Sequence, residues 1–93
     1  MLYVVYILES LKDGTMYTGQ TRNLESRLSR HNKGQVKSTK SKAPFRVAYV
    51  EVFESRSEAM WREWELKRKW NTDRKRKLIQ TAGVESLKSL MGL

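Results

Sequence analysis

The 93-residue chain contains no cysteine and a single histidine. The lack of cysteine excludes a disulfide framework and a thiolate metal site, and one histidine excludes a histidine-rich zinc site. No segment approaches the ~18 apolar residues of a membrane-spanning helix, and the N-terminus lacks the basic-then-apolar layout of a signal peptide. We therefore expect a cytoplasmic protein without membrane attachment.

Positive charge is the most prominent property of the composition. Nineteen Lys and Arg stand against ten Asp and Glu, so the formal net charge is +9. Aromatic residues make up 10% of the chain, which argues against intrinsic disorder. The length suits one domain of ~100 residues. We expect a single domain over residues 1–93, with its core at about residues 3–78 and a C-terminal tail at 79–93.

The basic residues are concentrated in two segments. Residues 22–46 carry eight basic and one acidic side chain, a sum of +7, and residues 65–93 carry eight and three, a sum of +5. The remaining segments, 1–21 and 47–64, sum to −1 and −2. Such basic segments attract polyanions through phosphate contacts and counterion release, so DNA or RNA is the expected partner. The alternative is a solvated basic surface that serves only solubility.

The N-terminal third predicts a β-hairpin. Residues 3–8 are a continuous β-branched and aromatic run, typical of a strand buried on both faces, and residues 15–19 resume strand character after a turn at Asp13-Gly14. If the connection at residues 9–14 closes symmetrically, Tyr6 faces Tyr17 across the pair, and the two phenols share one surface. A two-residue turn at Asp13-Gly14 would break that pairing.

A helix is predicted over residues 23–32, with Asn23 or Thr21 as its N-cap and Gly34 just beyond its end. Arg27 and His31 fall on the same stripe as the leucines that must face the sheet. A flexible basic loop at residues 33–42 follows, and a third strand is predicted at residues 45–53.

The C-terminal half predicts helices. Ser55 and Glu58 form a capping box before a long helix, in which Glu63 shares an inward-facing arc with neighbouring apolar side chains. That arc contains Ala59, Leu66 and Trp70 and is extended by Met60 and Trp64. A basic helix is predicted from residue 71 or 72 through Ile79. The pattern Val84-Leu87-Leu90-Met91 then indicates a last short helix or a frayed end. The order is ββαβα plus C-terminal helices.

Several chemically competent side chains thus occupy inward positions: Tyr6, Tyr17, Arg27, His31 and Glu63. Hydrolysis of a phosphodiester bond needs stabilisation of the phosphate charge, activation of water and usually a divalent cation. Arginine supplies a cation for phosphate, one carboxylate suits Mg²⁺, and a tyrosine or histidine can move a proton. Together the residues indicate a nuclease.

Each of these residues also has a purely structural interpretation. Tyr6 and Tyr17 are then strand aromatics, and Arg27 extends its guanidinium past the leucines to solvent. His31 is then a helix-terminal histidine, and Glu63 forms an ion pair with Arg27 or Lys67. Trp61, Trp64 and Trp70 are expected to pack in the core and between helices rather than to stack on bases.

The combination resembles the GIY-YIG nuclease superfamily. Val4-Val5-Tyr6 precedes Tyr17-Thr18-Gly19 by eleven residues, and Arg27, His31-Asn32 and Glu63 follow. The chain is most similar to the small stand-alone bacterial members, which are related to the nuclease module at the N-terminus of an excinuclease. The resemblance runs from about Tyr3 to about Leu78.

The resemblance implies an α/β (α+β) fold with a central three-stranded antiparallel sheet flanked by helices, and one Mg²⁺ or Mn²⁺ ion held by Glu63. Tyr6 would assist or accept the proton of the attacking water, and Tyr17 would orient the phosphate or the metal-bound waters. Arg27 would contact the scissile phosphate, and His31 would assist there or in proton transfer.

The chain departs from the family pattern at three places. Val4 replaces the glycine of the first triplet, and Thr18 replaces the isoleucine of the second. Many members carry an asparagine about twelve residues after the metal-binding glutamate, where this chain has Lys75, and its nearest asparagine is Asn71.

The leading hypothesis is a metal-dependent endonuclease that acts on DNA, with RNA left open as a substrate. Target choice would come from substrate shape or from a protein partner, and a role in DNA repair would fit. The rival hypothesis is a non-catalytic basic nucleic-acid-binding module with the same fold, and a protein-interaction adaptor ranks third. The residues expected to grip the nucleic-acid backbone are Arg22, Arg30, Lys33, Lys37, Lys40, Lys42, Arg74, Lys75 and Lys77.

Overall fold

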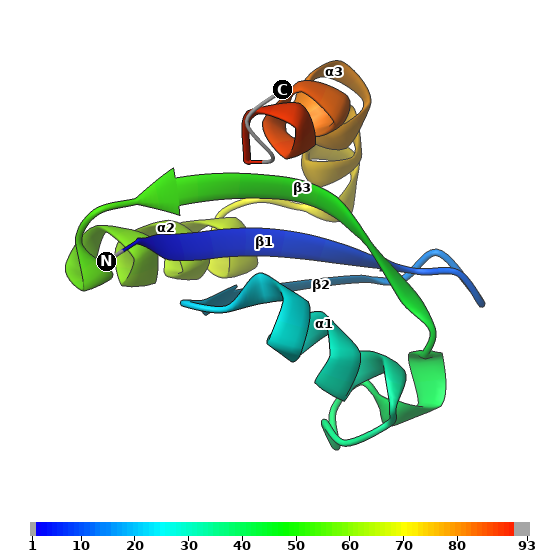
Figure 1. Cartoon of the computed structure of the whole chain (residues 1–93). Helices are drawn as coiled ribbons and strands as arrows, with labels where there is room; N and C mark the ends of the chain where they lie inside the picture. The colour runs from blue at the N-terminus through cyan, green and yellow to red at the C-terminus, as the bar shows by residue number, and fades with distance from the viewer. Residues whose placement is uncertain (1, 91–93) are drawn as a thin grey trace.

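The computed structural model describes residues 2–90 and contains one sheet with helices on both of its sides (Figure 1). The elements follow the predicted order, and the third strand has the predicted bounds. They are β1 (Tyr3–Ser10), β2 (Met16–Thr21), α1 (Leu24–Asn32), the 3-10 helix η1 (Lys40–Lys42), β3 (Phe45–Phe53), α2 (Arg56–Arg68) and α3 (Thr72–Leu90). The predicted three-stranded antiparallel sheet flanked by helices is confirmed.

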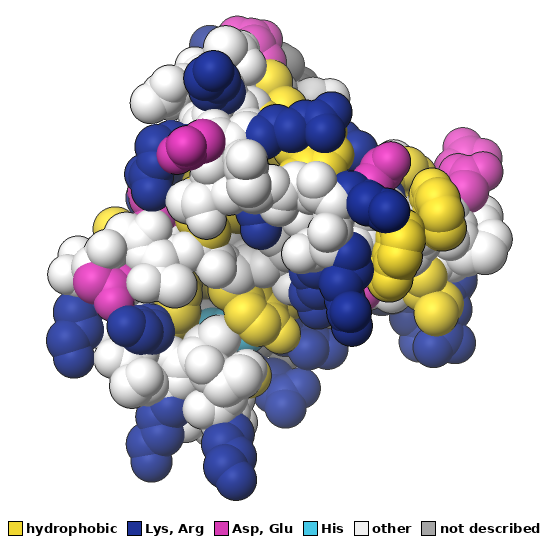
Figure 2. All heavy atoms as spheres, turned by 180° about the vertical axis from the view of Figure 1, so that it is seen from behind, with side chains coloured by type: hydrophobic (Ala, Val, Ile, Leu, Met, Phe, Trp, Pro, Cys, Tyr) yellow, Lys and Arg dark blue, Asp and Glu magenta, His cyan; other side chains and the backbone are white. Residues whose placement is uncertain are grey.

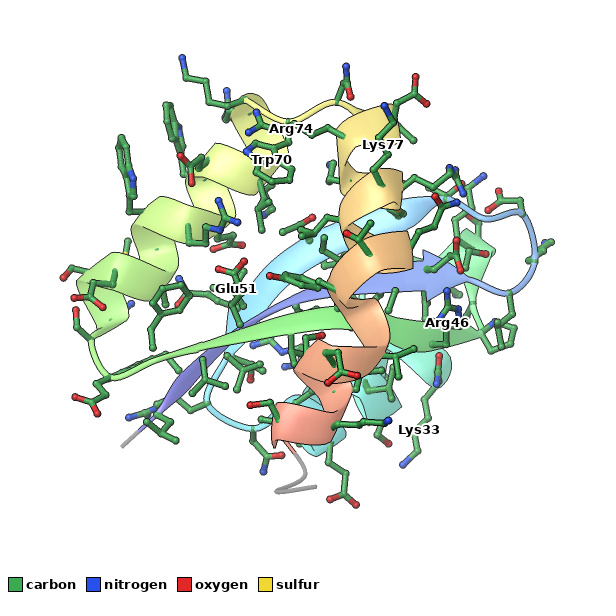
Figure 3. All side chains as sticks on the ribbon, turned by 90° about the horizontal axis from the view of Figure 1, so that it is seen from above. Lys33, Arg46, Glu51, Trp70, Arg74 and Lys77 are labelled. Carbon is green, nitrogen blue, oxygen red and sulfur yellow. The ribbon has the colours of Figure 1, made fainter. Side chains whose placement is uncertain are left out.

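β1 is the central strand, in the order β2-β1-β3, which explains why its residues are apolar without alternation. One face of the sheet buries Val4, Tyr6 and Leu8 against side chains of α1. The other face buries Val5 against Ala59 and Leu66 of α2. In Figure 1, α1 lies below the strands and α3 above them, and seen from above α3 crosses β3 (Figure 3).

The predicted register of the hairpin is wrong by two residues. Tyr6 pairs with Gly19, and Tyr17 pairs with Leu8. The strand pairing extends further into the connection than a symmetric loop at residues 9–14 would allow. Ser10 donates its N–H to the carbonyl of Thr15, and Gly14 adopts φ +78° in the turn. Since side chains alternate with a period of two, Tyr17 still projects from the same face as Tyr6.

The C-terminal segment is a continuation of the basic helix, not a separate short helix or a frayed end. α3 runs unbroken from Thr72 to Leu90, while Met91 of the predicted apolar pattern lies outside the described residues. Gly83 is buried within this helix, and a Cβ at this position would lie 2.6 Å from the carbonyl oxygen of Ala48. Glycine at this position therefore allows α3 to pack closely on β3, beyond the predicted end of the basic helix at Ile79.

The predicted inward arc of α2 is too wide. Ala59 and Leu66 are completely buried, but Met60 and Trp64 are 49% and 41% exposed, and Trp61 is 62% exposed. Trp70 alone among the tryptophans packs as predicted, beside the cluster that contains Val5. One narrow stripe of α2 is sufficient to cover its side of the sheet, so positions a quarter-turn away face solvent.

The segment predicted as a flexible basic loop is anchored at several points. Ser10 donates its hydroxyl to the carbonyl of Lys42, and η1 occupies residues 40–42. Thr39 is buried, with 3% of its surface exposed. These contacts hold the segment against the ends of β1 and α1, next to His31.

Candidate active site

The candidate site lies at the β2 edge of the sheet, between α1 and α2. Tyr6 and Tyr17 project from the strands toward α1, which supplies Arg27 and His31. α2 supplies Glu63, which forms an ion pair with Lys67 of the same helix. The ammonium group of Lys67 also lies over the ring of Tyr17. The charges of Arg27 and Glu63 both act on the Tyr6 phenol, so the structure brings together all five residues predicted for catalysis.

A glycine opposite Tyr6 makes room for the phenol. Tyr6 is 1% exposed, and its hydroxyl lies over Gly19, where a Cβ would stand 2.5 Å from the hydroxyl oxygen. No real Cβ atom tolerates such a contact, and the buried ring has little freedom to move away. The glycine of the second triplet therefore fixes where the Tyr6 hydroxyl lies.

His31 connects Tyr6 to the interior through hydrogen bonds. The Tyr6 hydroxyl lies 3.4 Å from Nε2 of His31, and Nδ1 lies 2.7 Å from Oγ1 of Thr39. Thr39 donates its own hydroxyl to the carbonyl of Val36, so Oγ1 accepts the proton of Nδ1. In a neutral imidazole this pattern places the proton on Nδ1 and leaves Nε2 to accept a hydrogen bond from Tyr6.

Two titratable groups of the site have shifted pKa values. Burial, followed by the nearby phenol of Tyr17, raises the pKa of Tyr6 to about 12. The charge of Glu63 also raises the pKa of Tyr6, while the charge of Arg27 lowers it. Burial lowers the pKa of His31, and the guanidinium groups of Arg27 and Arg30 lower it further. At neutral pH, Tyr6 is therefore a neutral phenol and His31 a neutral base.

Tyr17 occupies the outer part of the site. Its ring centroid lies 5.0 Å from that of His31, and Nζ of Lys67 lies 5.8 Å from the Tyr17 centroid. Lys67 also forms an ion pair with Glu63 at 2.9 Å. This pair is one of the two structural partners that the sequence suggested for Glu63. Tyr17 therefore stands between the buried Tyr6–His31 contact and the partly exposed carboxylate.

The donors at the site fit one hydrated divalent ion. Among residues 2–90, no three His, Cys, Asp or Glu side chains gather as a metal-binding group. Glu63 is thus a lone carboxylate, and 21% of its side chain is exposed. Mg²⁺ commonly takes one or two protein carboxylates and keeps several waters. The side chain of Lys67 is itself 41% exposed, and an ion pair this open contributes at most about 1 kcal/mol. A divalent cation can therefore displace Lys67 from the carboxylate.

The residues expected to contact nucleic acid differ in how accessible they are. Three of them make internal contacts. Lys42 forms an ion pair with Asp13, Arg74 lies 3.7 Å from the Trp70 ring centroid, and Lys75 is partly buried, which lowers the pKa of its ammonium group. Arg74 is nevertheless exposed, as are the remaining six: Arg22, Arg30, Lys33, Lys37, Lys40 and Lys77. Lys33 and Lys77 lie far apart in the view of Figure 3.

Two residues that support the site had no role assigned to them from the sequence. Thr39, which holds the imidazole of His31, carries no local signal because it lies within a polar stretch. Asn32 accepts the N–H of Phe45 at 2.7 Å and donates to the carbonyl of the same residue, so it fixes the end of α1 to the start of β3. Asn71 caps α3 by accepting the N–H of Arg74, which gives this asparagine a structural role.

The buried histidine predicts a stability that depends on pH. Its pKa in the folded protein lies below the ordinary value of 6.5, so the unfolded chain binds more protons as the pH falls through 6.5. His31 therefore contributes stability that is complete above about pH 6.5 and is lost toward acid pH. Thermal unfolding of the wild type should weaken more between about pH 7.5 and about pH 5.5 than that of His31→Gln. Parallel pH dependences of the two proteins would contradict this prediction.

Comparison with known proteins identifies the family. The GIY-YIG catalytic domain family matches residues 2–77. A UPF0213 protein from Staphylococcus haemolyticus is 43% identical over 79 residues, which cover 84% of this chain and 94% of the relative. A UPF0213 protein from Staphylococcus saprophyticus is 41% identical over 78 residues, with 83% and 93% covered.

A solved structure agrees with these relatives. The solution NMR structure of a UPF0213 protein from Bacillus halodurans has a TM-score of 0.58 and 38% sequence identity, and the match covers 89% of this chain and 87% of that one. Within residues 2–90, no helix has the length and apolar character to cross a membrane. The chain belongs to the GIY-YIG catalytic domain family, a family of nucleases.

Proposed function

We propose that the protein is a divalent-metal-dependent endonuclease that hydrolyses phosphodiester bonds in DNA. The observation that carries the proposal is the contact of the buried Tyr6 hydroxyl with a neutral His31, beside Arg27 and Glu63. A hydrogen-bonded phenol and imidazole next to a guanidinium and a carboxylate supply proton transfer and charge stabilisation at one place.

The protonation states of Tyr6 and His31 favour a proton relay through Tyr6. With a pKa near 12, the phenol is protonated at neutral pH and accepts a proton from water only if it releases its own. Nε2 of His31 lies within reach of that proton. In the proposed step the attacking water gives a proton to Tyr6 Oη while Tyr6 gives its proton to His31. The imidazolium that forms keeps its Nδ1–H bond to Thr39.

The remaining residues act on the phosphate and the metal. Arg27 binds the scissile phosphate and stabilises the charge that develops on its oxygens, and Tyr17 orients the phosphate or its waters. Glu63 would hold Mg²⁺ or Mn²⁺ after Lys67 releases the carboxylate. When bound, the ion supplies Lewis-acid stabilisation of the phosphoryl oxygens. Substrate shape, or a protein partner, would choose the target.

A non-catalytic nucleic-acid-binding module is the second candidate. The ion pair of Glu63 with Lys67 favours it, because a carboxylate held this way also serves as an ordinary helix pair. A binder of this kind would bind DNA in a salt-dependent manner and would be indifferent to metal.

Cleavage of supercoiled plasmid and of branched oligonucleotides, with Mg²⁺, Mn²⁺ or EDTA, separates the two candidates. We expect nicked and linear products only when metal is present. An RNA strand of matching sequence tests whether DNA is preferred. Salt-dependent binding with no cleavage of any substrate would contradict the endonuclease and support the binding module.

A further inference from the structure

α2 exposes a pair of tryptophans at the surface. Trp61 is 62% exposed and Trp64 is 41% exposed, although α2 already buries its Ala59 and Leu66 against the sheet. The rings of Trp61 and Trp64 stack, with centroids 5.0 Å apart and an interplanar angle of 23°. Neither ring belongs to the two core clusters. Large aromatic side chains left at the surface in this way mark interaction sites rather than packing.

The tryptophan pair adjoins the proposed catalytic carboxylate. Trp64 lines the same surface depression as Glu63 and Lys67. Trp61 and Trp64 together line a neighbouring depression, which shares Met60 with the first. A group stacked on the pair would therefore lie next to Glu63 on the same helix.

Positive charge flanks the pair on one side, at the C-terminal end of α2. Lys67, Arg68 and Lys69 follow in sequence and are exposed, and Nζ of Lys69 lies 5.6 Å from the Trp64 ring centroid. The acidic Glu65 of the same helix is held by Arg62 at 2.7 Å. Figure 2, which views the molecule from behind, shows hydrophobic side chains at the surface beside Lys and Arg.

We propose that Trp61 and Trp64, here called the tryptophan platform, stack on an unpaired nucleobase of the substrate strand next to Glu63. A nucleobase offers an aromatic face to the platform, and its flanking phosphates meet the adjacent cations. Bases inside a duplex are stacked on one another and cannot reach such a surface. This inference rests on the proposed function and narrows its substrate class to strands with unpaired nucleotides, such as single strands and flaps.

Binding to a strand without bases tests the platform apart from catalysis. An oligothymidylate and an abasic oligonucleotide of the same length carry the same phosphates and differ only in their bases. Fluorescence anisotropy is measured with EDTA present and at fixed salt. The wild-type chain should bind oligothymidylate about 5- to 150-fold more tightly than the abasic oligonucleotide. Trp61→Leu and Trp64→Leu keep an apolar side chain and should reduce this preference, whereas Trp61→Phe should retain most of it.

Leu11→Ala provides the matched control. Leu11 is 61% exposed, like Trp61, and lies between β1 and β2, so its loss should not change the preference for bases. Equal affinity of the wild type for both oligonucleotides, or an unchanged preference in Trp61→Leu, would overturn the platform. Self-association that disappears in Trp61→Leu, without any base preference, would also overturn it by assigning the pair to a protein interface.

The result separates the platform from the proposed endonuclease. A base preference that needs the tryptophans, without cleavage of any substrate, would support the platform and overturn the endonuclease. Metal-dependent cleavage that treats single strands and blunt duplexes alike, and is unchanged in Trp61→Leu, would support the endonuclease and overturn the platform.

Discussion

Glu63→Gln is expected to abolish metal-dependent cleavage of DNA while DNA binding persists. Glutamine keeps the size of the side chain but removes the charge that would hold the cation. The expected loss corresponds to several kcal/mol of transition-state stabilisation, on the order of a thousandfold in rate. Binding should persist because contacts between basic side chains and phosphates do not involve this carboxylate. Plasmid nicking and anisotropy with a labelled oligonucleotide measure the two quantities.

Glu65→Gln is the matched control for this variant. Glu65 lies on the same helix and forms an ion pair with Arg62, whereas Glu63 forms its ion pair with Lys67 beside Tyr17. Both substitutions remove one negative charge, so any general electrostatic effect on DNA binding is the same in the two proteins. Equal loss of cleavage in both variants, or loss in neither, would show that Glu63 is not the metal ligand.

Tyr6→Phe is the second change with a large expected effect. The phenylalanine ring fills the same buried space, but no hydroxyl remains to pass a proton to His31. Loss of a general acid–base group costs about 10²- to 10⁴-fold in rate. The fold should remain intact, because one neutral hydrogen bond contributes only about 1 kcal/mol. Single-turnover cleavage should therefore slow strongly in Tyr6→Phe, whereas thermal unfolding should change little.

Tyr49→Phe controls for the loss of a buried phenol. Tyr49 is 8% exposed, burial and Glu51 raise its pKa to about 12 as well, and it projects from the opposite face of the sheet. Its hydroxyl donates to Glu51 at 2.6 Å instead of facing the site. Cleavage should be normal in this variant, and a comparable loss would show that the effect of Tyr6→Phe is structural.

The relay also predicts how cleavage depends on pH. His31 accepts the proton of Tyr6 only in its neutral form, and its lowered pKa keeps it neutral at and above the ordinary histidine value of 6.5. The cleavage rate of the wild type should therefore fall as the pH drops below that value. A rate that rises toward acid pH would contradict the role of His31 as proton acceptor.

The sequence alone predicted most of the fold because its signals are local. Apolar residues without alternation identified β1 as a strand buried on both faces, and β3 was predicted at residues 45–53, where it is found. The N-cap of the predicted capping box was also correct, since Ser55 accepts the N–H of Glu58 at the start of α2. The inward stripes of α1 and α2 correctly grouped His31 and Glu63 with buried neighbours, so the composition of the candidate site was accessible before the structure.

Other features depend on contacts between residues far apart in the chain. The hairpin register is set by how the turn closes. A shift of two residues leaves every side chain on the same face of the sheet, so hydrophobic alternation cannot distinguish the two registers. The continuation of α3 beyond Ile79 was not predicted, because nothing in the sequence reveals that the Ala48 carbonyl packs against Gly83. Thr39 gave no signal because its role depends on the imidazole that lies beside it in space.

What the sequence determined by itself is where the strands and helices run and which chemically competent side chains they carry, since hydrophobic periodicity and capping act over a few residues. The tertiary structure decided what those residues do next to one another. Packing places Tyr6 over Gly19 and against His31, which makes one a protonated phenol and the other a neutral base. Packing also leaves Trp61 and Trp64 at the surface, because the width of the stripe that α2 buries is set by the sheet beneath it.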